Sequence, residues 1–302
     1  MYGYPITVFT PSYNRAYILE NAYRSLTRQT MPDFEWLIID DGSTDNTEEL
    51  VRKFIDEQKI RIRYYKKSNG GKHTAVNMGV EKAEGKLFLI LDSDDYLKDT
   101  ALERVLFWEN TIKNENQFGG VSGLKVFENG VPIGQKWLPE TDYVDALAFE
   151  KDRKKYGLLG DKAEAYYTDV LRKFCPLPVY EGERDVEIGV LWNRVANAGY
   201  KVRWFREGIY VCEYLEDGLS ANSVQLHLKN FKGFTCWKKE LIDMQTNYIN
   251  VVRETSSFVG LASLKGLNVA EMAKAIGRKP VTVWLAKVHL ALHKLKQKSK
   301  GK

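Results

Sequence analysis

The stretch "KLFLILDSDD", residues 86–95, places three carboxylates directly after a run of apolar residues. The apolar run from Leu87 to Leu91 is typical of a buried strand. Asp92, Asp94 and Asp95 follow at its end. Carboxylates this close together repel one another, and their charged forms are costly unless a cation joins them. The stretch therefore predicts a central strand that leads into a polar site.

The chain before this strand follows the same plan. "ITVFT" (6–10) and "FEWLIID" (34–40) read as buried strands, and apolar residues at helical spacing follow each of them. Strands that alternate with helices in this way indicate a mostly parallel sheet, and ligands bind such sheets outside the carboxyl ends of the strands. The polar stretches "TPSYNR" (10–15), "DDGSTD" (40–45) and "NGGKH" (69–73) are therefore expected near the carboxylates.

The later part of the chain is less regular. Residues 118–143 read as strands and turns, and residues 144–175 read as polar helices. A helix followed by a strand is expected over 182–205, and mostly helices are expected after residue 221. The whole chain is thus expected to be an α/β domain with a helical appendage.

Oxygen-only ligands at a strand end suit Mg²⁺ or Mn²⁺, which also bind phosphate oxygens. A cation held by only one or two carboxylates implies a phosphate ligand, as in a nucleotide or a sugar nucleotide. "NGGKH" adds backbone N–H groups, a lysine and a helix N-terminus, which favour an anionic ligand. The alternative is structural: Asp94 or Asp95 would cap the following helix, and the other carboxylates would be solvated.

The motifs "TPSYNR", "DDGSTDNT", "NGGKHTAVNMG" and "EGKLFLILDSDD", taken in order, resemble those of the family 2 glycosyltransferases, which are inverting enzymes with the GT-A fold. The resemblance covers residues 4–215. It implies an α/β fold with a mostly parallel sheet flanked by helices. Residues 1–221 would form the GT-A domain, and residues 222–302 would form a basic helical C-terminal region.

The resemblance implies nucleotide-sugar binding by residues of all four motifs. These residues are Pro11, Tyr13, Arg15, Asp41, Gly71, Lys72, Asp92 and Ser93. Pro11 and Tyr13 would line the nucleobase pocket, where an aromatic face can stack on any base. Asp41 would accept a base N–H, as from uracil. Gly71 and Lys72 would lie near the ribose or the diphosphate.

The resemblance also implies a metal site in the D-x-D sequence. Asp94 and Asp92 would provide it for Mn²⁺ or Mg²⁺, with Asp94 as the metal ligand and Asp92 nearer the ribose. Asp95 is a third candidate.

Inverting transfer needs a carboxylate that takes the proton from the acceptor hydroxyl as this attacks the anomeric carbon. Many family members carry a Glu-Asp pair at a helix start, and here "GERDVEIGVLWNR" (182–194) corresponds to it, with Arg184 interrupting the pair. Asp185 is the first choice for the base, Glu187 aligns in another register, and Glu183 is the third choice. The alternative is a charged helix start that complements the helix dipole.

A further segment, "EYLEDGLSANS" (213–223), resembles one that often closes the donor site in this family. Asp217 or Ser220 would approach the diphosphate there. A plain Asp-Gly turn is the alternative.

Charge is distributed unevenly along the chain. Residues 222–302 hold 15 Lys and Arg and 4 Asp and Glu, so their net charge is +11, whereas the whole chain carries +5 and the remainder −6. A helix expected over 281–295 has one apolar stripe, formed by Val281, Trp284, Leu285, Val288, Ala291, Leu292 and Leu295. With Lys287, Lys294, Lys296 and His293 off the stripe, this helix could lie on an anionic membrane surface. The alternative is that it buries the stripe on its own domain or on a second copy in a homo-oligomer.

The resemblance, together with these patterns, implies a metal-dependent inverting glycosyltransferase in bacterial surface polysaccharide or capsule synthesis. Its donor would be a nucleotide-sugar, and the resemblance implies that this sugar is linked to UDP. Its acceptor would be a hydroxyl of a glycan or of a lipid-linked molecule. One alternative is a sugar nucleotidyltransferase, although the G-x-x-x-R-type loop expected of it is absent after the first strand. Another is a non-catalytic scaffold at a membrane surface.

Composition adds expectations about location and partners. The N-terminus has no signal-peptide pattern, no apolar run is long enough to span a membrane, and the three cysteines are far apart. A cytoplasmic protein is therefore expected, and the basic C-terminal helix leaves a peripheral location on the inner face of the cell membrane open. Nucleic-acid binding is not expected, because the body of the chain is acidic and carries no motif for it.

Overall fold

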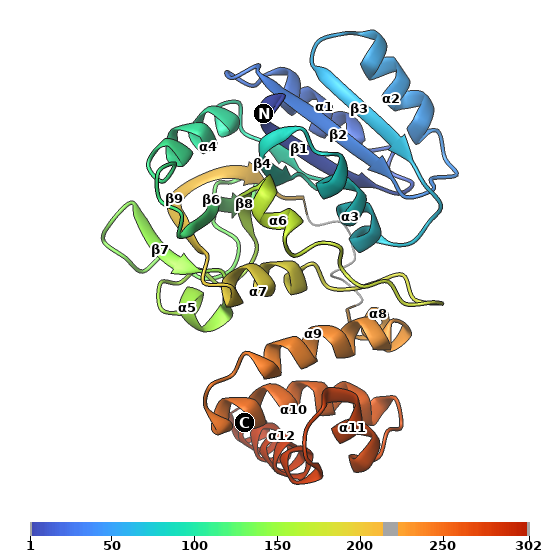
Figure 1. Ribbon diagram of the computed structural model, residues 1–302, viewed down its shortest axis with the longest axis vertical. Coiled ribbons are helices and arrows are strands. Elements are labelled where there is room, and N and C mark those ends of the chain that lie inside the picture. The colour runs from blue at the N-terminus through green and yellow to red at the C-terminus, as the bar shows by residue number, and fades with distance from the viewer. Residues whose placement is uncertain (1, 214–222, 301–302) are drawn as a thin grey trace. The chain divides into compact units, whose positions relative to one another are not determined.

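The computed structural model describes residues 2–213 and 223–300 and divides into two compact units (Figure 1). The sheet unit comprises Met1–Leu177 and Arg194–Glu216, and the helical unit comprises Pro178–Asn193 and Asp217–Lys302. Asp217, Ser220 and the domain boundary expected at residues 221 and 222 lie outside the described residues, so these expectations stay predictions.

The sheet unit is built on one nine-stranded sheet with the order β3-β2-β1-β4-β8-β6-β9-β5, and β7 pairs with β9. The strands are β1 (Tyr4–Ser12), β2 (Phe34–Asp40), β3 (Arg61–Lys66), β4 (Gly85–Ile90), β5 (Tyr96–Leu97), β6 (Phe118–Val126), β7 (Tyr143–Leu147), β8 (Lys162–Tyr167) and β9 (Lys201–Val211). The helices between them are α1 (Leu19–Thr27), α2 (Thr47–Asp56), α3 (Lys72–Lys82), α4 (Ala101–Asn110), α5 (Glu150–Lys154), α6 (Thr168–Arg172) and α7 (Gly189–Asn197).

Four neighbouring strands, β3, β2, β1 and β4, are parallel, as the sequence predicts. Ser12 pairs with Asp40, and Phe9 pairs with Ile90. The carboxyl ends of β1, β2 and β4 therefore meet at one edge, which brings the polar stretches after them together. β8 then pairs antiparallel with both β4 and β6, so the far half of the sheet is mixed.

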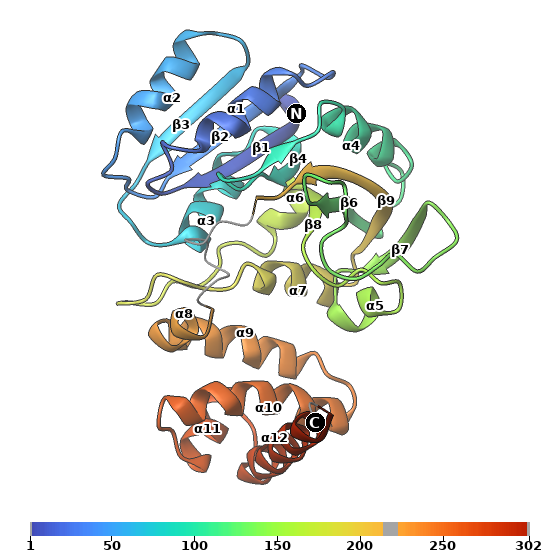
Figure 2. The same ribbon diagram turned by 180° about the vertical axis from the view of Figure 1, so that it is seen from behind.

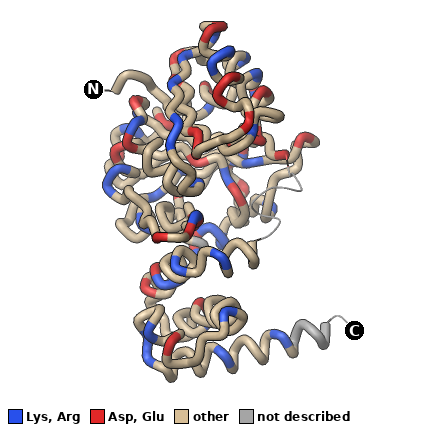
Figure 3. Tube along the Cα trace, turned by 90° about the vertical axis from the view of Figure 1, so that its right-hand side faces the viewer, with Lys and Arg blue, Asp and Glu red and all other residues tan. Residues whose placement is uncertain are grey.

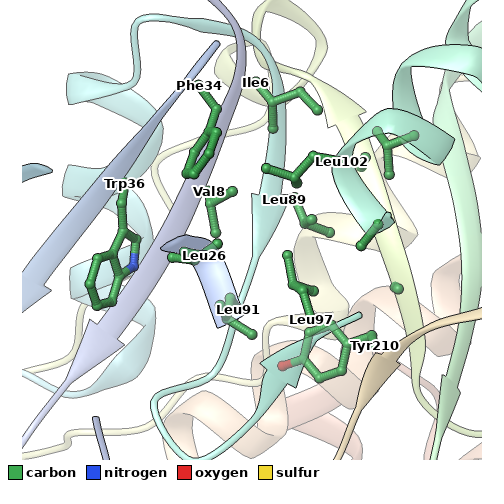
Figure 4. Packing of buried hydrophobic residues seen from close by; sticks show 14 of the residues in the cluster. Ile6, Val8, Leu26, Phe34, Trp36, Leu89, Leu91, Leu97, Leu102 and Tyr210 are labelled. Carbon is green, nitrogen blue, oxygen red and sulfur yellow. The ribbon is translucent and has the colours of Figure 1, made fainter. Parts of the chain in front are cut away.

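Alternating side chains of the central strands serve the two faces of the sheet. On one face Val8, Leu89 and Leu91 pack with Leu26 and Trp36 (Figure 4). Helices α1, α2 and α4 cover this face and lie in front in Figure 2, whereas α3 and α6 cover the other face and lie in front in Figure 1. The sheet is thus covered on both sides, and its central strands β1, β2 and β4 are accordingly mostly buried on both faces.

The expectation of helices over 144–175 is wrong for most of that segment. β7 and β8 are strands, and α5 and α6 are helices of only five residues each. The sequence of β8, "KAEAYY", contains good helix formers, but it is hydrogen-bonded on both sides, by β4 and β6. Pairing with strands distant in sequence overrides the weak local preference.

The helical unit contains α8 (Ser223–Lys229), α9 (Phe231–Asp243), α10 (Tyr248–Leu264), α11 (Val269–Ile276) and α12 (Pro280–Lys300). Its core includes Phe258 of α10 and Val283 and Ala286 of α12. The apolar stripe predicted for α12 does not lie on the side of the helix that carries Val283 and Ala286 into the core, since Trp284 and Leu292 are exposed. The alternative that this stripe is buried on its own domain is therefore wrong.

Candidate active site

Two polar stretches are hydrogen-bonded to each other at the edge where β1 and β2 end. The Asn14 amide donates to Ser43 Oγ (2.9 Å), and Asn14 Oδ1 accepts from the Thr44 amide (2.8 Å). Pro11 lies just before this contact in β1 and is partly exposed. Tyr13 beside it is 46% exposed, so an aromatic face is open to solvent at this edge. That exposure is compatible with the predicted stacking role.

Asp41 organises the glycine-rich loop that precedes α3. Its Oδ2 accepts from the Gly71 amide (2.7 Å), and its Oδ1 accepts from the Gly70 amide (3.0 Å) and from Lys67 Nζ (2.5 Å). Gly71 has φ 93°, a left-handed conformation that suits glycine. Both oxygens of Asp41 thus have partners within the protein, and the predicted bond to a nucleobase stays a prediction. The sequence did not single out Lys67.

Asp92 lies between two lysines. Lys72 Nζ lies 2.5 Å from its Oδ1, and Lys125 Nζ lies 3.5 Å from its Oδ2. Burial opposes ionisation of Asp92, but the two ammonium groups outweigh it and hold the pKa of this carboxyl well below its usual range. The Asp92 amide donates to the Tyr210 hydroxyl (2.9 Å). Asp92 is therefore ionised and already neutralised by the protein.

Asp95 ties the acidic loop to the end of β9. Its Oδ1 accepts from the Glu213 amide (3.0 Å), and Cys212 Sγ donates to its Oδ2 (3.4 Å). Lys125 Nζ lies 3.8 Å from the same Oδ2. Burial raises the pKa of Asp95 to about 6. These contacts give Asp95 a structural role.

Asp94 is the carboxylate left open. Within residues 2–213 and 223–300 it makes no hydrogen bond or ion pair with another residue. Burial, followed by the charge of Asp92, raises the pKa of Asp94. Helix α4 begins only at Ala101, so the alternative that Asp94 or Asp95 caps it is wrong. Of the three carboxylates, Asp94 has the most capacity to accept a cation.

Ser93 and Arg15 are the remaining residues that were predicted to bind the nucleotide-sugar. Ser93 is buried between Asp92 and Asp94, with 7% of its surface exposed. Arg15 donates from Nη1 to the Tyr17 hydroxyl (2.8 Å). Its positive charge lowers the pKa of Asp94, but less than burial and the charge of Asp92 raise it.

Lys125 is a site residue that sequence reasoning missed. It projects from β6 with a side chain only 11% exposed, and its ammonium lies 4.0 Å from the centre of the Tyr210 ring. Burial opposes its charge, but Asp92 outweighs this and raises the pKa of Lys125. The available signal was a single lysine within the apolar stretch "GGVSGLKVF" (119–127).

The three candidate bases lie in the helical unit, and Glu183 differs from the other two. Its two oxygens accept from the Lys232 and Gly233 amides, at 2.8 and 2.9 Å. These amides belong to the first turn of α9, where helix N–H groups lack partners within the helix. The neighbouring Arg184 amide donates to Asn230 Oδ1 (2.8 Å). Glu183 therefore caps α9.

Asp185 and Glu187 lie beside a histidine that the sequence did not indicate. His227 Nε2 lies 2.7 Å from Glu187 Oε1. One ligand atom from each of Asp185, Glu187 and His227 lies within 4.8 Å of the others, a spacing that could also hold a metal ion. A Cβ on Gly233 would lie 2.1 Å from the Asp185 carbonyl oxygen, so only glycine permits this approach of α9.

The candidate bases are not part of a helix start. Helix α7 begins at Gly189 and has no acidic residue in its first turn. The alternative of a charged helix start that complements the dipole of α7 is therefore wrong for Asp185 and Glu187. Contacts with α8 and α9 hold this segment instead.

Known proteins resemble the first part of this chain. Residues 7–119, which include the four motifs, match the family model described as glycosyl transferase family 2. This part of the chain is thus similar to glycosyl transferase family 2. The match covers β1 to β4 and the acidic loop, and the candidate bases lie beyond it.

Several curated proteins match this chain over part of their length. TuaG of Bacillus subtilis, named for teichuronic acid biosynthesis, is 38% identical over 147 residues, which are 47% of this chain and 56% of TuaG. Chondroitin synthase of Pasteurella multocida is 40% identical over 101 residues, 33% of this chain and 10% of the synthase. An uncharacterized glycosyltransferase of Rickettsia felis is 40% identical over 126 residues, 41% of this chain and 20% of that protein. The chain thus spans between a tenth and about half of the length of these relatives.

Solved structures of glycosyltransferases share the fold. Staphylococcus aureus TarS residues 1–349 in complex with UDP has a TM-score of 0.58 at 17% identity, over 94% of this chain and 91% of that one. A mannosyltransferase of Pyrobaculum calidifontis, in complex with GDP-Man and Mn²⁺, has a TM-score of 0.57 at 17% identity. The likeness covers 97% of this chain and 81% of the mannosyltransferase chain. The predicted GT-A fold is confirmed.

Proposed function

We propose that this chain is a metal-dependent inverting glycosyltransferase that moves a sugar from a UDP-sugar to a hydroxyl of a glycan or glycolipid acceptor. The observation that carries the proposal is the open carboxylate of Asp94 beside the lysine-held Asp92, at the sheet edge where the other motifs meet. A role in surface polysaccharide synthesis, including a capsule, is supported by the likeness to TuaG and chondroitin synthase.

The donor would bind at the carboxyl edge of β1, β2 and β4. Tyr13 and Pro11 would hold the base, and the Gly71 turn at the start of α3 would lie near the diphosphate, where helix N–H groups favour anions. Lys72 would exchange part of its contact with Asp92 for a phosphate oxygen. UDP as the carrier is supported by the TarS complexes with UDP and UDP-GlcNAc, whereas the mannosyltransferase complex contains GDP-Man.

The residues at this edge fit a divalent ion. Asp94 would be the main protein ligand, because it has no competing partner among the described residues, and Asp92 would be the second. Carboxylate oxygens are suitable ligands for both Mn²⁺ and Mg²⁺. Such an ion, when bound, neutralises charge on a diphosphate leaving group.

Asp185 or Glu187 would act as the base. The acceptor hydroxyl would give its proton to this carboxylate while its oxygen forms a bond to the anomeric carbon. The bond from that carbon to the diphosphate would break on the opposite side, so the configuration would invert. Glu183 is a poorer candidate, because both of its oxygens already cap α9.

The test is a donor screen that measures nucleotide release from UDP- and GDP-sugars, with sugar acceptors and Mn²⁺ or Mg²⁺ present. Release of UDP together with a glycosylated product supports the proposal. Release of pyrophosphate from UTP and a sugar phosphate would support the nucleotidyltransferase alternative. Absence of both release and UDP binding would favour a non-catalytic scaffold.

A further inference from the structure

Helix α12 has two apolar sides, and among the described residues of the helical unit only one of them packs into the core. Val283 and Ala286 are fully buried in the core of that unit. The other side carries the exposed stripe, which we define as Val281, Trp284, Val288, Leu292 and Leu295, with exposed fractions of 54, 59, 39, 55 and 63%. Residues three, four or seven apart share one side of a helix, so these five form a continuous row.

Positive charge borders the exposed stripe. Lys287 follows Trp284 of the stripe by three residues, so the two are neighbours on the helix surface. Lys294 follows Ala291 by three residues and therefore lies on the same side of the stripe as Lys287. Residues 278–302 contain eight Lys and Arg and no Asp or Glu. Along the described part of α12, Figure 3 accordingly shows Lys and Arg positions without acidic ones.

We propose that α12 lies in the plane of an anionic lipid surface, with the exposed stripe entering the acyl region and the lysines contacting the headgroups. This inference goes beyond the proposed glycosyl transfer and does not depend on it. An apolar row bordered by lysines, with a tryptophan in the row, has the composition of a helix that lies at a membrane interface. Lysine side chains can extend from such a position to the headgroups.

Two features favour the surface of a lipid bilayer over a second copy of the chain or a membrane-spanning position as the environment of the exposed stripe. A symmetric contact between two copies would bring the same basic borders together, and residues 278–302 offer no acidic group to balance them. Among the described residues no helix is long and apolar enough to cross a membrane, so α12 would lie on the surface.

The experiment is cosedimentation of the full chain with two kinds of vesicle, phosphatidylcholine alone and phosphatidylcholine mixed with phosphatidylglycerol. The test variant is Trp284→Ser with Leu292→Ser, and the control is Phe107→Ser, an exposed apolar residue of α4 in the sheet unit. We expect binding to the anionic vesicles, weakened at high salt, and a loss of about tenfold or more in the test variant only. Lys287→Glu with Lys294→Glu should also weaken binding.

The same proteins are examined by light scattering and thermal unfolding, because the substitutions should leave the fold unchanged. The proposal is overturned if the wild-type chain does not bind the anionic vesicles, or if the test variant binds them as the control does. It is also overturned if the wild-type chain is a dimer in solution that the test variant converts to a monomer, since the stripe then belongs to an interface between copies.

Discussion

His227 of α8 and Glu187, forty residues earlier in the chain, are joined by a contact of 2.7 Å between Nε2 and Oε1. The His227 ring also packs near Phe234 and Trp237, at centroid distances of 4.9 and 5.9 Å. The C-terminal helices therefore position a candidate base as well as forming a separate core. This role was not visible in their sequence, which shows mainly basic charge.

His227→Ala should lower kcat between about tenfold and a hundredfold with a small change in the KM for donor, because a misplaced base slows the chemical step more than binding. Steady-state kinetics with the best donor measures both values. The matched control is His289→Ala, since His289 contacts Ser256 in the same unit. Equal losses in the two variants would show a general effect on the helical unit instead of a positioning role.

Among the three candidate bases, Glu183 should behave as a structural residue, and Asp185 or Glu187 should behave as the base. Glu183→Gln should lower stability by about 1 kcal/mol, because it weakens the cap of α9, and leave kcat nearly unchanged. Asp185→Asn or Glu187→Gln should lower kcat by about 10²-fold or more without a matching loss of stability. Thermal unfolding and turnover are measured on all three variants. If neither Asp185→Asn nor Glu187→Gln lowers turnover, the assignment of the base is wrong.

Lys125→Met should destabilise the sheet unit by about 3–5 kcal/mol, because it removes the buried cation beside Asp95 and leaves Asp92 with the ion pair to Lys72 alone among the described residues. Chemical denaturation measures the change in the free energy of unfolding. The control is Lys53→Met, whose ion pair with Glu49 is exposed on α2 and should contribute less than about 1 kcal/mol. A similar small loss in both variants would contradict the role given to Lys125.

Stability should depend on the ionisation of Asp95 between about pH 4 and pH 6. The folded chain keeps the proton on Asp95 up to a pKa of about 6, whereas an unfolded chain loses it near pH 4. The native state binds more protons in this window, so this contribution to stability falls as pH rises. Relative to Asp95→Asn, the wild-type chain should lose about 2–3 kcal/mol across the window. Parallel pH profiles of the two proteins, from denaturant titrations, would contradict this.

Part of the fold could be predicted from sequence because its signals are local. The apolar runs of β1, β2 and β4 and the polar residues after them are each contiguous, and parallel pairing then brings the polar ends together. β8 could not be recognised in the same way. Its residues favour a helix locally, and only pairing with β4 and β6 makes it a strand.

The candidate site shows the same division. Asp92, Asp94 and Asp95 were found as a group, but their different roles depend on residues far along the chain. Lys125 is 33 residues from Asp92, and the Glu213 amide is 118 residues from Asp95. No local pattern indicates which carboxylate receives these contacts, so only the folded structure leaves Asp94 as the open one.

The most direct test of the central claim is calorimetric titration of UDP with and without Mn²⁺ into the wild-type chain, Asp94→Asn and Asp95→Asn. We expect Mn²⁺ to raise UDP affinity in the wild-type chain by about tenfold or more, and we expect this gain to vanish in Asp94→Asn and to persist in Asp95→Asn. An undiminished gain in Asp94→Asn would contradict the assignment of Asp94 as the metal ligand. If His227→Ala abolished the gain instead, the ion would belong to the cluster of Asp185, Glu187 and His227.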